Sequence, residues 1–572
     1  MLPISNFKFF RHTKLRMYEF SLCLHQYKSQ VFVTVIFQRH RLRLVSLNET
    51  ELIMSVLFLF TYSFLIIGSN EAARILAVFP VPSISHQVVF RPLTQELARR
   101  GHEVTIITPD PVFKNGGAPK NLTEIDVHDI SYNIWLENFI KAASKGNKND
   151  LFSQTEIILS SFAAVFDEQV QSEEVQKIIN DKNKKFDLLL IEACVRPALA
   201  FSYIYKNVPV ILVSSLGAVP GNYDWIGASE HPILYPSILR QRLHNLTFWE
   251  KITELYTHYR IMKIFEDVEP IENKVLRKNF GPDVPPVEEL ENNVDMLFLN
   301  VHPIFEGIRP VPPSVVYMGG LHQKPQKDLP ADLKTYLDSS KKGVIYISFG
   351  TNVDPTMLPP ERIQVLVKVF SQLPYDVLWK WNNDELPGRS ENIKISKWLP
   401  QSDLLRHPKV KLFITQGGLQ STDEAITAGV PLIGVPMLAD QWFNVEKYVY
   451  LKIGAQLDLE TLTEEQFKNA ITTVIEDPSY RRNIEKLRSV MKDEPMPPLE
   501  RAVWWTEHVL RHGGARHLRA PAANMSWTQY LELELVFTVL IGLLALLVVF
   551  FTALIVLYKY LTKGVSVKVK RN

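Results

Sequence analysis

WLPQ (398–401), FITQGGLQSTDEA (413–425) and GVPLIGVPMLADQ (429–441) are the three stretches that decide the fold. The apolar residues at the start of the second stretch and through the third predict two short buried strands, with a helix between them. Strands that alternate with helices predict a parallel sheet. Because parallel strands all end at one edge, the polar residues that follow each strand are expected to gather there.

The turn at Gly417-Gly418 separates the predicted strand Lys411 to Thr415 from a helix that we expect to begin near Ser421. Residues without side chains let a ligand approach the backbone. A helix N-terminus adds unpaired N–H groups and a positive dipole end, which is how proteins commonly bind a pyrophosphate. Nearby, Trp398 offers a flat face for a base, and Glu424 offers an acceptor for ribose hydroxyls.

Each candidate also has a structural alternative. Ser421 and Glu424 fit a capping box, in which the two side chains bind backbone amides at the start of a helix. Asp440 follows the predicted strand 431–435 and can cap a helix that begins at Trp442. Trp398, taken alone, fits core packing. The joint pattern favours a ligand site, and the alternatives stay open.

This combination of residues resembles the donor signature of UDP-glycosyltransferases, and the resemblance runs from about Arg74 to the C-terminus. It implies a GT-B fold, in which two doubly wound α/β domains face each other across a cleft. It also implies a UDP-sugar as co-substrate, with no further cofactor. The implied donor contacts are Trp398 and Gln401 to uracil, Glu424 to ribose, Thr351, Ser421 and the Gly418 turn to phosphate, and Asp440 and Gln441 to the sugar.

One donor position departs from the family pattern. Gln416 stands where most members carry His. An amide N–H can still donate to a phosphate oxygen, but it supplies no positive charge.

A second candidate site lies in the N-terminal half. Residues 74–79 predict a strand, and His86 is expected to begin a helix that runs to Arg100. The positive end of the helix dipole disfavours imidazolium, so this position would help to keep His86 neutral and able to accept a proton. The run from Phe186 to Ile191 predicts another buried strand that ends in Glu192. Both side chains would then lie at the carboxyl edge of one sheet.

By the family resemblance, His86 is the catalytic base and Glu192 orients it, although the family's acid is usually Asp. Glu is one methylene longer, and Asp187 is a second candidate at the other end of the strand. The implied reaction is a single in-line displacement with inversion, in which UDP leaves. No carboxylate pair or His cluster with metal-ligand spacing accompanies these residues, so no metal is expected.

The length of 572 residues is too great for one core, which favours two α/β halves. No internal repeat is evident. The predicted divisions are an extension (1–53), a signal peptide (54–72), an acceptor-binding domain (73–301), a linker (302–342), a UDP-sugar-binding domain with a helical segment (343–525), a transmembrane helix (535–558) and a basic cytosolic tail (559–572).

The two ends predict the topology. Leu535 to Tyr558 is apolar, carries no charge and is long enough to span a bilayer. The Lys- and Arg-rich tail after it is expected in the cytosol, and its last residues fit a dilysine retrieval pattern of the endoplasmic reticulum. Met54 opens an apolar segment typical of a cleaved secretory signal. The competing interpretation is a basic N-terminal extension with a signal anchor. Either way, we expect a single-pass endoplasmic-reticulum protein with lumenal domains.

Other features limit the partners. Sequons stand at Asn121, Asn245 and Asn524, as a lumenal glycoprotein would allow. With Cys23 in the extension, Cys194 is left alone, so the mature protein would have no internal disulfide. A net charge of +2 argues against nucleic acid. The lipid bilayer is an expected partner, and a homo-oligomer is left open.

The acceptor is the least determined feature. Aromatic residues within 130–144 and 223–235 are candidates for an apolar acceptor cavity, with core packing as the alternative. The resemblance is closest to insect members and implies glucose as the sugar, small lipophilic alcohols or phenols as acceptors, and detoxification or metabolite conjugation. A non-catalytic lipophile-binding protein and a nucleotide-sugar epimerase remain alternatives.

Overall fold

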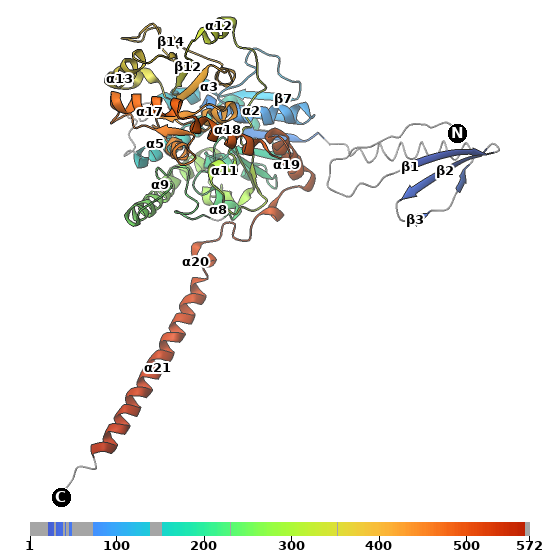
Figure 1. Cartoon of the computed structure of the whole chain (residues 1–572). Coiled ribbons are helices and arrows are strands. Elements are labelled where there is room, and N and C mark those ends of the chain that lie inside the picture. The colour runs from blue at the N-terminus through green and yellow to red at the C-terminus, as the bar shows by residue number, and fades with distance from the viewer. Residues whose placement is uncertain are drawn as a thin grey trace. The chain divides into compact units, whose positions relative to one another are not determined.

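The computed structural model describes residues 72–137, 151–228, 230–351 and 353–566, together with four short strands nearer the N-terminus (Figure 1). The chain divides into two compact units, Met1–Ala72 and Ala73–Asn572. Nearly all of the predicted signal peptide, 54–71, and the end of the basic tail, 567–572, lie outside the described residues.

Within 1–53, which the sequence analysis treats as an extension, the structure places four antiparallel strands. Strand β2 pairs with each of the others, and its sequence, QVFVTVIF, is rich in the β-branched and aromatic residues that favour strands. The bounds are β1 (Ser21–Tyr27), β2 (Gln30–Phe37), β3 (His40–Arg41) and β4 (Val45–Leu47).

The first large sheet has seven parallel strands in the order β11-β10-β9-β8-β5-β6-β7. Its central strands are continuous apolar runs such as LLLIE, because helices cover both faces of a parallel sheet. The chain leaves β5 toward β6 on one side and returns to β8 on the other, so the strand order reverses between β5 and β8. A crevice at the carboxyl ends of such strands is the usual ligand site. The bounds are β5 (Arg74–Val78), β6 (Glu103–Thr108), β7 (Leu122–Asp126), β8 (Leu188–Glu192), β9 (Val210–Ser214), β10 (Val294–Leu299) and β11 (Val315–Tyr317).

The second large sheet has six parallel strands in the order β14-β13-β12-β15-β16-β17. Its order reverses between β12 and β15, whose carboxyl ends lead into the Gly350 and Gly417 turns. The bounds are β12 (Val344–Ser348), β13 (Asp376–Lys380), β14 (Ile393–Ser396), β15 (Val410–Thr415), β16 (Leu432–Gly434) and β17 (Gly454–Gln456).

Helices connect and cover both sheets (Figure 1). With the first sheet go α2 (Ile84–Arg99), α3 (His128–Trp135), α5 (Leu151–Gln171), α6 (Glu173–Asn180), α7 (Phe201–Ile204), α8 (Asn222–Ile226), α9 (Phe248–Phe280), α10 (Val287–Leu290), α11 (Pro303–Glu306) and the 3₁₀ turns η3 (Arg196–Ala200) and η4 (Glu291–Asn293). With the second go α12 (Ala331–Ser339), η5 (Pro355–Met357), α13 (Pro360–Ser371), α14 (Gln401–Leu405), α15 (Leu419–Ala428), α16 (Gln441–Tyr450), α17 (Glu464–Glu476) and α18 (Pro478–Lys492).

Two elements lie across the predicted domain divisions. Strand β11 is in the predicted linker, yet it pairs with β10 and completes the first sheet. Helix α19 (Pro498–His512) follows the second sheet in sequence, yet Val503 and Val509 pack in the hydrophobic cluster formed by α2 and the first sheet. Burial of a large apolar side chain is worth about 1.5–3 kcal/mol, and this burial stabilises the packing of α19 on the N-terminal half.

The chain ends in η6 (Arg516–Leu518), α20 (Trp527–Tyr530) and the long helix α21 (Leu533–Ser566). Within the described residues, Leu533–Lys563 is the one helix segment that is long and apolar enough to cross a membrane. Its side chains are exposed, which excludes a helix buried in a protein core. The structure therefore provides a single candidate anchor.

Candidate active site

His86 and Glu192 meet at the reversal point of the first sheet. Helix α2 begins at Ile84, two residues before the predicted start, so His86 lies in its first turn. His86 Nδ1 lies 2.7 Å from Glu192 Oε1, and Val81 N donates to Glu192 Oε2 at 3.0 Å. The Glu192 side chain is fully buried. Both carboxylate oxygens are therefore engaged, and the extra methylene of Glu is accommodated.

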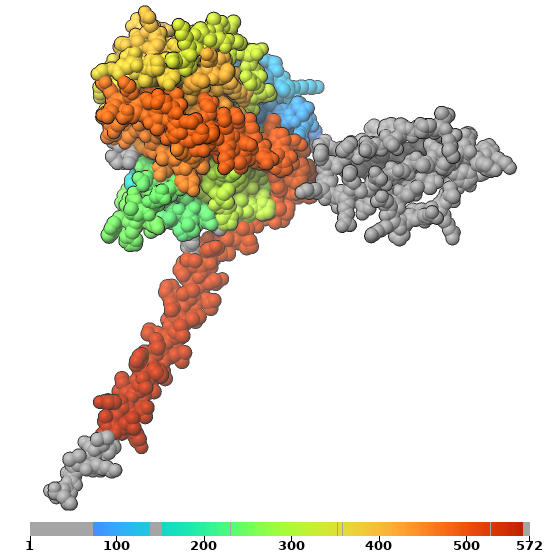
Figure 2. Space-filling model, in the orientation of Figure 1, coloured from blue at the N-terminus to red at the C-terminus, as the bar shows by residue number. Residues whose placement is uncertain are grey.

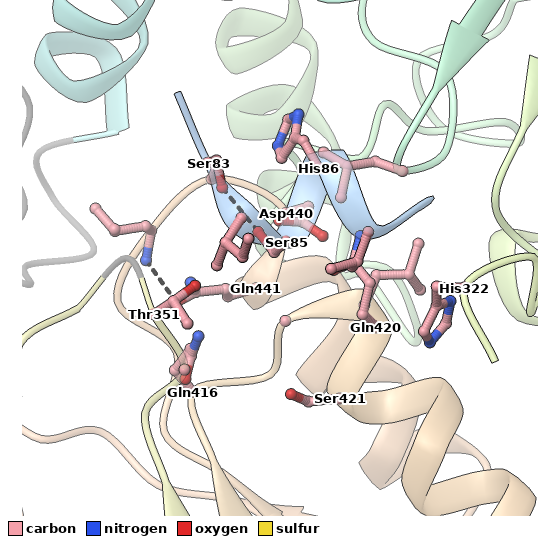
Figure 3. Close-up of a pocket in the computed structure, with 18 of the residues that line it drawn as sticks. Ser83, Ser85, His86, His322, Thr351, Gln416, Gln420, Ser421, Asp440 and Gln441 are labelled. Carbon is pink, nitrogen blue, oxygen red and sulfur yellow. Dashed lines mark hydrogen bonds between the residues drawn. The ribbon is translucent and has the colours of Figure 1, made fainter. Parts of the chain in front are cut away.

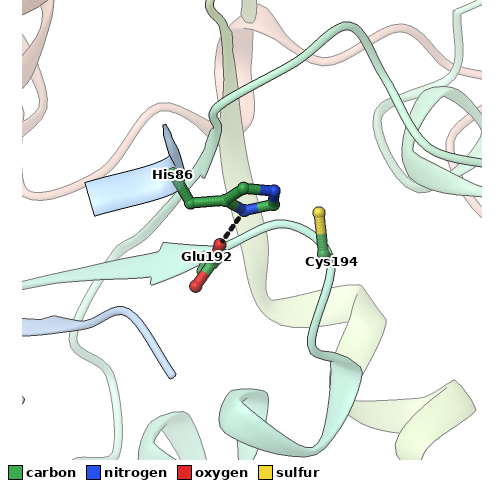
Figure 4. A group of neighbouring side chains, drawn as sticks. All are labelled: His86, Glu192 and Cys194. Atoms are coloured by element: carbon green, nitrogen blue, oxygen red, sulfur yellow. Dashed lines mark hydrogen bonds and ion pairs between the residues drawn. The ribbon is translucent and has the colours of Figure 1, made fainter. Parts of the chain in front are cut away.

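This pairing determines what the imidazole can do. An ionised carboxylate only accepts, so the ring must donate its Nδ1–H. A neutral ring then carries its lone pair on Nε2, at the edge away from Glu192 (Figure 4). Since His86 lines the large cavity, that nitrogen can accept a proton from a bound molecule. The second candidate, Asp187, is excluded as the partner of His86 because its carboxylate accepts from the backbone N and the guanidinium of Arg74.

Cys194 lies beside this pair (Figure 4), and the ligand atoms of His86, Glu192 and Cys194 are all within 4.8 Å of one another. Burial raises the pKa of the Cys194 thiol well above its usual range, so it is a poor nucleophile. Glu192 already accepts two hydrogen bonds, which leaves two protein groups for an ion, fewer than the three or four of a typical zinc site. That no metal takes part stays a prediction.

On the opposite side of the cavity, Gln401 organises the donor-side residues. Its amide nitrogen donates to Ser421 Oγ at 2.9 Å and to Glu424 Oε2 at 2.8 Å, and its oxygen accepts from Tyr346 OH at 3.0 Å. Burial raises the pKa of Glu424. Trp398 lines the same cavity with 68% of its surface exposed, so the core-packing alternative for Trp398 is wrong.

The capping-box alternative is also wrong. Helix α15 begins at Leu419, its N-cap is Gly418, and no side chain caps it. Ser421 and Glu424 therefore lie within the helix, where both accept from Gln401.

The glycine turn needs the conformation that only glycine adopts freely. Gly417 has φ 90°, and a Cβ there would lie 2.4 Å from Val445 Cγ2. Gln416 is buried, and its Oε1 has no hydrogen-bond partner among the described residues. Its amide packs on Gly350, at φ 76°, where a Cβ would meet Gln416 Nε2 at 2.3 Å. The two strand-end turns thus fit against each other.

Asp440 and Gln441 follow β16 and hold the loop at the start of α16. Asn444 Nδ2 donates to Asp440 Oδ2 at 2.8 Å, while Gln441 Oε1 accepts from Met437 N and Leu438 N at 2.9 Å. Asp440 occupies the N-cap position but makes no side-chain cap, so the capping alternative for Asp440 is wrong as well. Burial raises the pKa of Asp440 to about 6. Because the Gln441 oxygen is already engaged, the NH₂ group is the part of the Gln441 side chain that remains for a ligand.

One cavity of about 520 Å³ brings these residues together. Figure 3 shows His86 on one side and Gln416, Ser421 and Thr351 on the other, with Asp440 between. Its lining includes every predicted site residue except Glu192, which lies behind His86. Much of the remaining wall is apolar, although Gln154 and Thr155 of α5 also line it. The apolar residues come from α5 and neighbouring elements: Trp135, Leu151, Ile158, Leu159, Phe162, Leu216, Val219, Ile238, Leu239 and Phe265.

This wall differs from the predicted acceptor segments. Trp135 lines the cavity as expected, but Tyr132 donates instead to Asp110, and 138–144 lies outside the described residues. Tyr223 and Tyr235 line a separate small pocket of about 10 Å³. Helix α5 supplies four of these ten apolar residues, and its apolar face was not distinguishable from core in the sequence.

Comparison with known proteins agrees with this geometry. Residues 74–571 match the family model described as UDP-glucoronosyl and UDP-glucosyl transferase. The chain belongs to this family. It is similar to the ecdysteroid UDP-glucosyltransferase of Spodoptera littoralis nuclear polyhedrosis virus, with 36% identity over 83% of this chain and 95% of the relative. It is also similar to UDP-glucosyltransferase 2 of Dactylopius coccus, with 30% identity over 90% of this chain and 99% of the relative.

Solved structures agree on the fold. The UDP-glycosyltransferase is similar to UDP-glucose: anthocyanidin 3-O-glucosyltransferase in complex with UDP, with a TM-score of 0.51 and 17% identity over 77% of this chain and 99% of that chain. The glycosyltransferase VinC in complex with DTDP gives a TM-score of 0.52 at 15% identity, over 77% and 99%. The predicted family, GT-B fold and enzyme class, a glycosyltransferase that uses a UDP-sugar, are confirmed.

Two further residues of the UDP-glycosyltransferase line the cavity but were missed in the sequence. Lys380 ends β13, and its Nζ donates to Gly350 O at 3.0 Å and Asn382 Oδ1 at 2.9 Å. Burial lowers the pKa of Lys380, and its ammonium lies beside the turn where Gln416 supplies no charge. The strand-end rule applied to DVLWK would have found it.

His322 gave no such signal. It comes from the loop after β11, is buried, and neither ring nitrogen has a hydrogen-bond partner within the described part of the chain. Figure 3 shows it at the cavity near Gln420.

Proposed function

We propose that this UDP-glycosyltransferase transfers glucose from UDP-glucose to a hydroxyl of a small lipophilic acceptor, with inversion at the anomeric carbon. The observation that supports this proposal is that His86 and the donor-side residues line one cavity, much of whose remaining wall is apolar. His86 Nε2 takes the hydroxyl proton, the oxygen forms a bond to the anomeric carbon, and the bond from that carbon to UDP breaks. Glu192 stabilises the imidazolium that results.

The leaving UDP is stabilised by groups at the reversal point of the second sheet. Thr351, the Gln416 amide, the N-terminus of α15 and Ser421 would meet its phosphates, and Lys380 adds a positive charge beside the Gly350 turn. No step is assigned to a metal.

The remaining donor contacts follow the cavity lining. Trp398 stacks on uracil beside Gln401, Glu424 accepts from ribose, and Asp440 with Gln441 binds hydroxyls of the sugar. Glucose is proposed because Asp440 and Gln441 supply no cation for a carboxylated sugar. Relatives named as UDP-glucosyltransferases support the same choice.

For the acceptor, the apolar wall supports a lipophilic alcohol or phenol. The relatives named as ecdysteroid UDP-glucosyltransferases make a polycyclic alcohol of that class a good first acceptor. Conjugation of such compounds, for detoxification or metabolite control, is the proposed role.

The deciding assay uses microsomes from cells that express the full chain, with UDP-glucose or UDP-glucuronate and a panel containing a simple phenol and an ecdysteroid. A glucoside formed from UDP-glucose, with UDP released in equal amount, supports the proposal. A glucuronide instead would overturn the choice of sugar. UDP binding with no product across the panel would support a non-catalytic lipophile-binding protein, and UDP-sugar consumed without an acceptor would indicate an epimerase.

The location proposed is the endoplasmic-reticulum membrane, with α21 as the anchor and both large sheets in the lumen. Lys559 and Lys563 follow the apolar stretch, which supports a cytosolic tail. Of the three sequons, Asn121 donates both hydrogens of its amide, to Ala98 O and His102 O, so a glycan there would remove one of these two donors. Protease protection of the large sheets in sealed microsomes checks this orientation.

Replacing Trp398 with Ala should weaken UDP binding with little effect on folding. Stacking of a base on an aromatic side chain is worth about 1–3 kcal/mol, which corresponds to a Kd for UDP roughly 5- to 150-fold higher. Since Trp398 is largely exposed, the melting temperature should stay within error. Trp504→Ala, at an exposed tryptophan outside the cavity, is the control for calorimetric titration. Equal UDP affinity in both variants would remove Trp398 from the donor site.

Asp440 should make donor binding depend on pH. Its raised pKa means that the carboxylate gains its proton as pH falls through about 6, at a higher pH than an ordinary Asp. A hydrogen bond to a charged acceptor exceeds one to a neutral acceptor by about 1 kcal/mol, so the Kd for UDP-glucose should rise about fivefold from pH 7.5 to pH 5. Asp440→Asn should bind more weakly, with no such slope. The same slope in both proteins would assign it to another group.

A further inference from the structure

Helix α9 carries an exposed apolar stripe along its first three turns. Its six side chains are between 42% and 73% exposed: Phe248, Trp249, Ile252, Leu255, Tyr256 and Tyr259. At 100° per residue they fall within an arc of about 120°, on one face of the helix. The face that packs on the body is roughly opposite and includes Glu254, Ile261 and Phe265. The α9 stripe is therefore a second apolar face, and its side chains stay exposed in the described part of the chain.

The stripe ends sharply. From Arg260 to Lys278 the exposed positions of α9 are mainly charged, as at Lys263, Glu266 and Asp267. The apolar part spans 12 residues, or about 18 Å of helix. A contiguous apolar surface of this kind on a soluble domain marks an interaction site. Because the change occurs within one helix, the stripe is a local feature of 248–259.

The chain itself holds this region close to a membrane. Asn524 N donates to Asp224 O at 3.1 Å, and Ala520 N donates to Ile226 O at 3.2 Å, so the segment before the anchor is fastened to α8. Helix α21 begins at Leu533, nine residues after Asn524. Nine residues reach at most about 30 Å, so α8 must stay near the bilayer that α21 crosses.

Helix α9 lies beside α8 near the C-terminal end of the stripe. Tyr223 of α8 lines one small pocket together with His258 and Ile261, which lie on the packed face of α9, and Tyr259 of the stripe stands between those two residues in the sequence. Figure 1 shows α8 and α9 at the same end of the body, and Figure 2 shows α9 in green at its surface. Ile308, which is also exposed, neighbours Arg309 of the same pocket.

We propose that the α9 stripe lies in the interfacial layer of the bilayer spanned by α21, as a second contact between the enzyme and the membrane. Trp and Tyr are the residues that favour this layer, and an amphipathic helix lies along it with its apolar face turned to the acyl chains. Lys251, which is exposed beside the stripe, suits an anionic headgroup. The occupant is thus a lipid surface.

The test labels the stripe in the full-length protein, reconstituted in vesicles of phosphatidylcholine and phosphatidylserine. Tyr256→Cys and Trp249→Cys are each labelled with an environment-sensitive fluorophore. The matched control is Lys468→Cys, at an exposed position on α17, a helix of the second sheet. The unsubstituted chain shows how much label the native cysteines take up. UDP binding by each variant shows that it is folded.

Spin-labelled lipid should quench the two stripe labels several-fold more than the Lys468 label, at every ratio of protein to lipid. Equal, weak quenching at all three positions would overturn the proposal. Emission changes that follow protein density and ignore the lipid quencher would assign the stripe to contact with a second copy. As an independent readout, we expect the Asn245 sequon, three residues before the stripe, to be empty, because a glycan would hold this end of α9 off the bilayer. An occupied Asn245 would contradict the proposal.

Discussion

We expect His86→Ala to lower the rate of sugar transfer by roughly 10²- to 10⁴-fold, while the affinity for UDP should stay close to that of the parent protein. The loss is that of a general base that removes the acceptor proton in the transition state. UDP binding should be retained because the proposed nucleotide contacts come from the second sheet and the loops after it, whereas His86 comes from α2. Initial rates at saturating UDP-glucose and acceptor, beside calorimetric titration with UDP, measure the two quantities separately.

His128→Ala is the matched control for this variant. His128 also lies in the first turn of a helix of the first sheet, but its Nδ1 binds Pro109 O and it does not line the cavity. Its removal should leave the rate within a few-fold. If His86→Ala kept full activity, the base would be another group. If it lost UDP affinity as well, the defect would lie in folding or domain closure.

Glu192→Gln should lower turnover on a similar scale, about 10²- to 10⁴-fold, with little change in the KM for donor. The physical reason is the tautomer of His86. Val81 N must still find an acceptor in this fully buried position, so the amide oxygen of Gln faces Val81 and the NH₂ group faces His86 Nδ1. Since NH₂ can only donate, Nδ1 must become the acceptor and Nε2 carries the proton. The base then has no lone pair toward the cavity.

The control for this variant is Asp187→Asn, which removes a carboxylate near the other end of the same strand. Asp187 is partly exposed and paired with Arg74, so its loss should cost at most about 1 kcal/mol of stability and leave turnover unchanged. Turnover and KM from initial rates, with melting temperatures for both variants, give the comparison. Turnover of Glu192→Gln within threefold of the parent would show that the carboxylate is not needed.

Much of the local structure was predictable because its causes are local. The apolar runs RILAVF and KLFIT predicted β5 and β15 to within a residue, since buried parallel strands need such runs. The glycine pair gave the turn after β15. Helix starts were less certain: α2 and α15 each begin two residues before their predicted positions, and for α15 that difference decides between a capping box and a ligand site.

The sequence by itself determined the family, the two parallel sheets, the candidate anchor and which residues end strands at a common edge. Only the tertiary structure decided that Glu192 reaches His86, that Lys380 and His322 join the cavity, that α5 contributes to its apolar wall, and that α19 returns to the first sheet. Periodicity and turn chemistry depend on neighbours in the chain, so a sequence shows them. Contacts between residues a hundred positions apart depend on how helices pack on sheets, and that packing is set by all the side chains together.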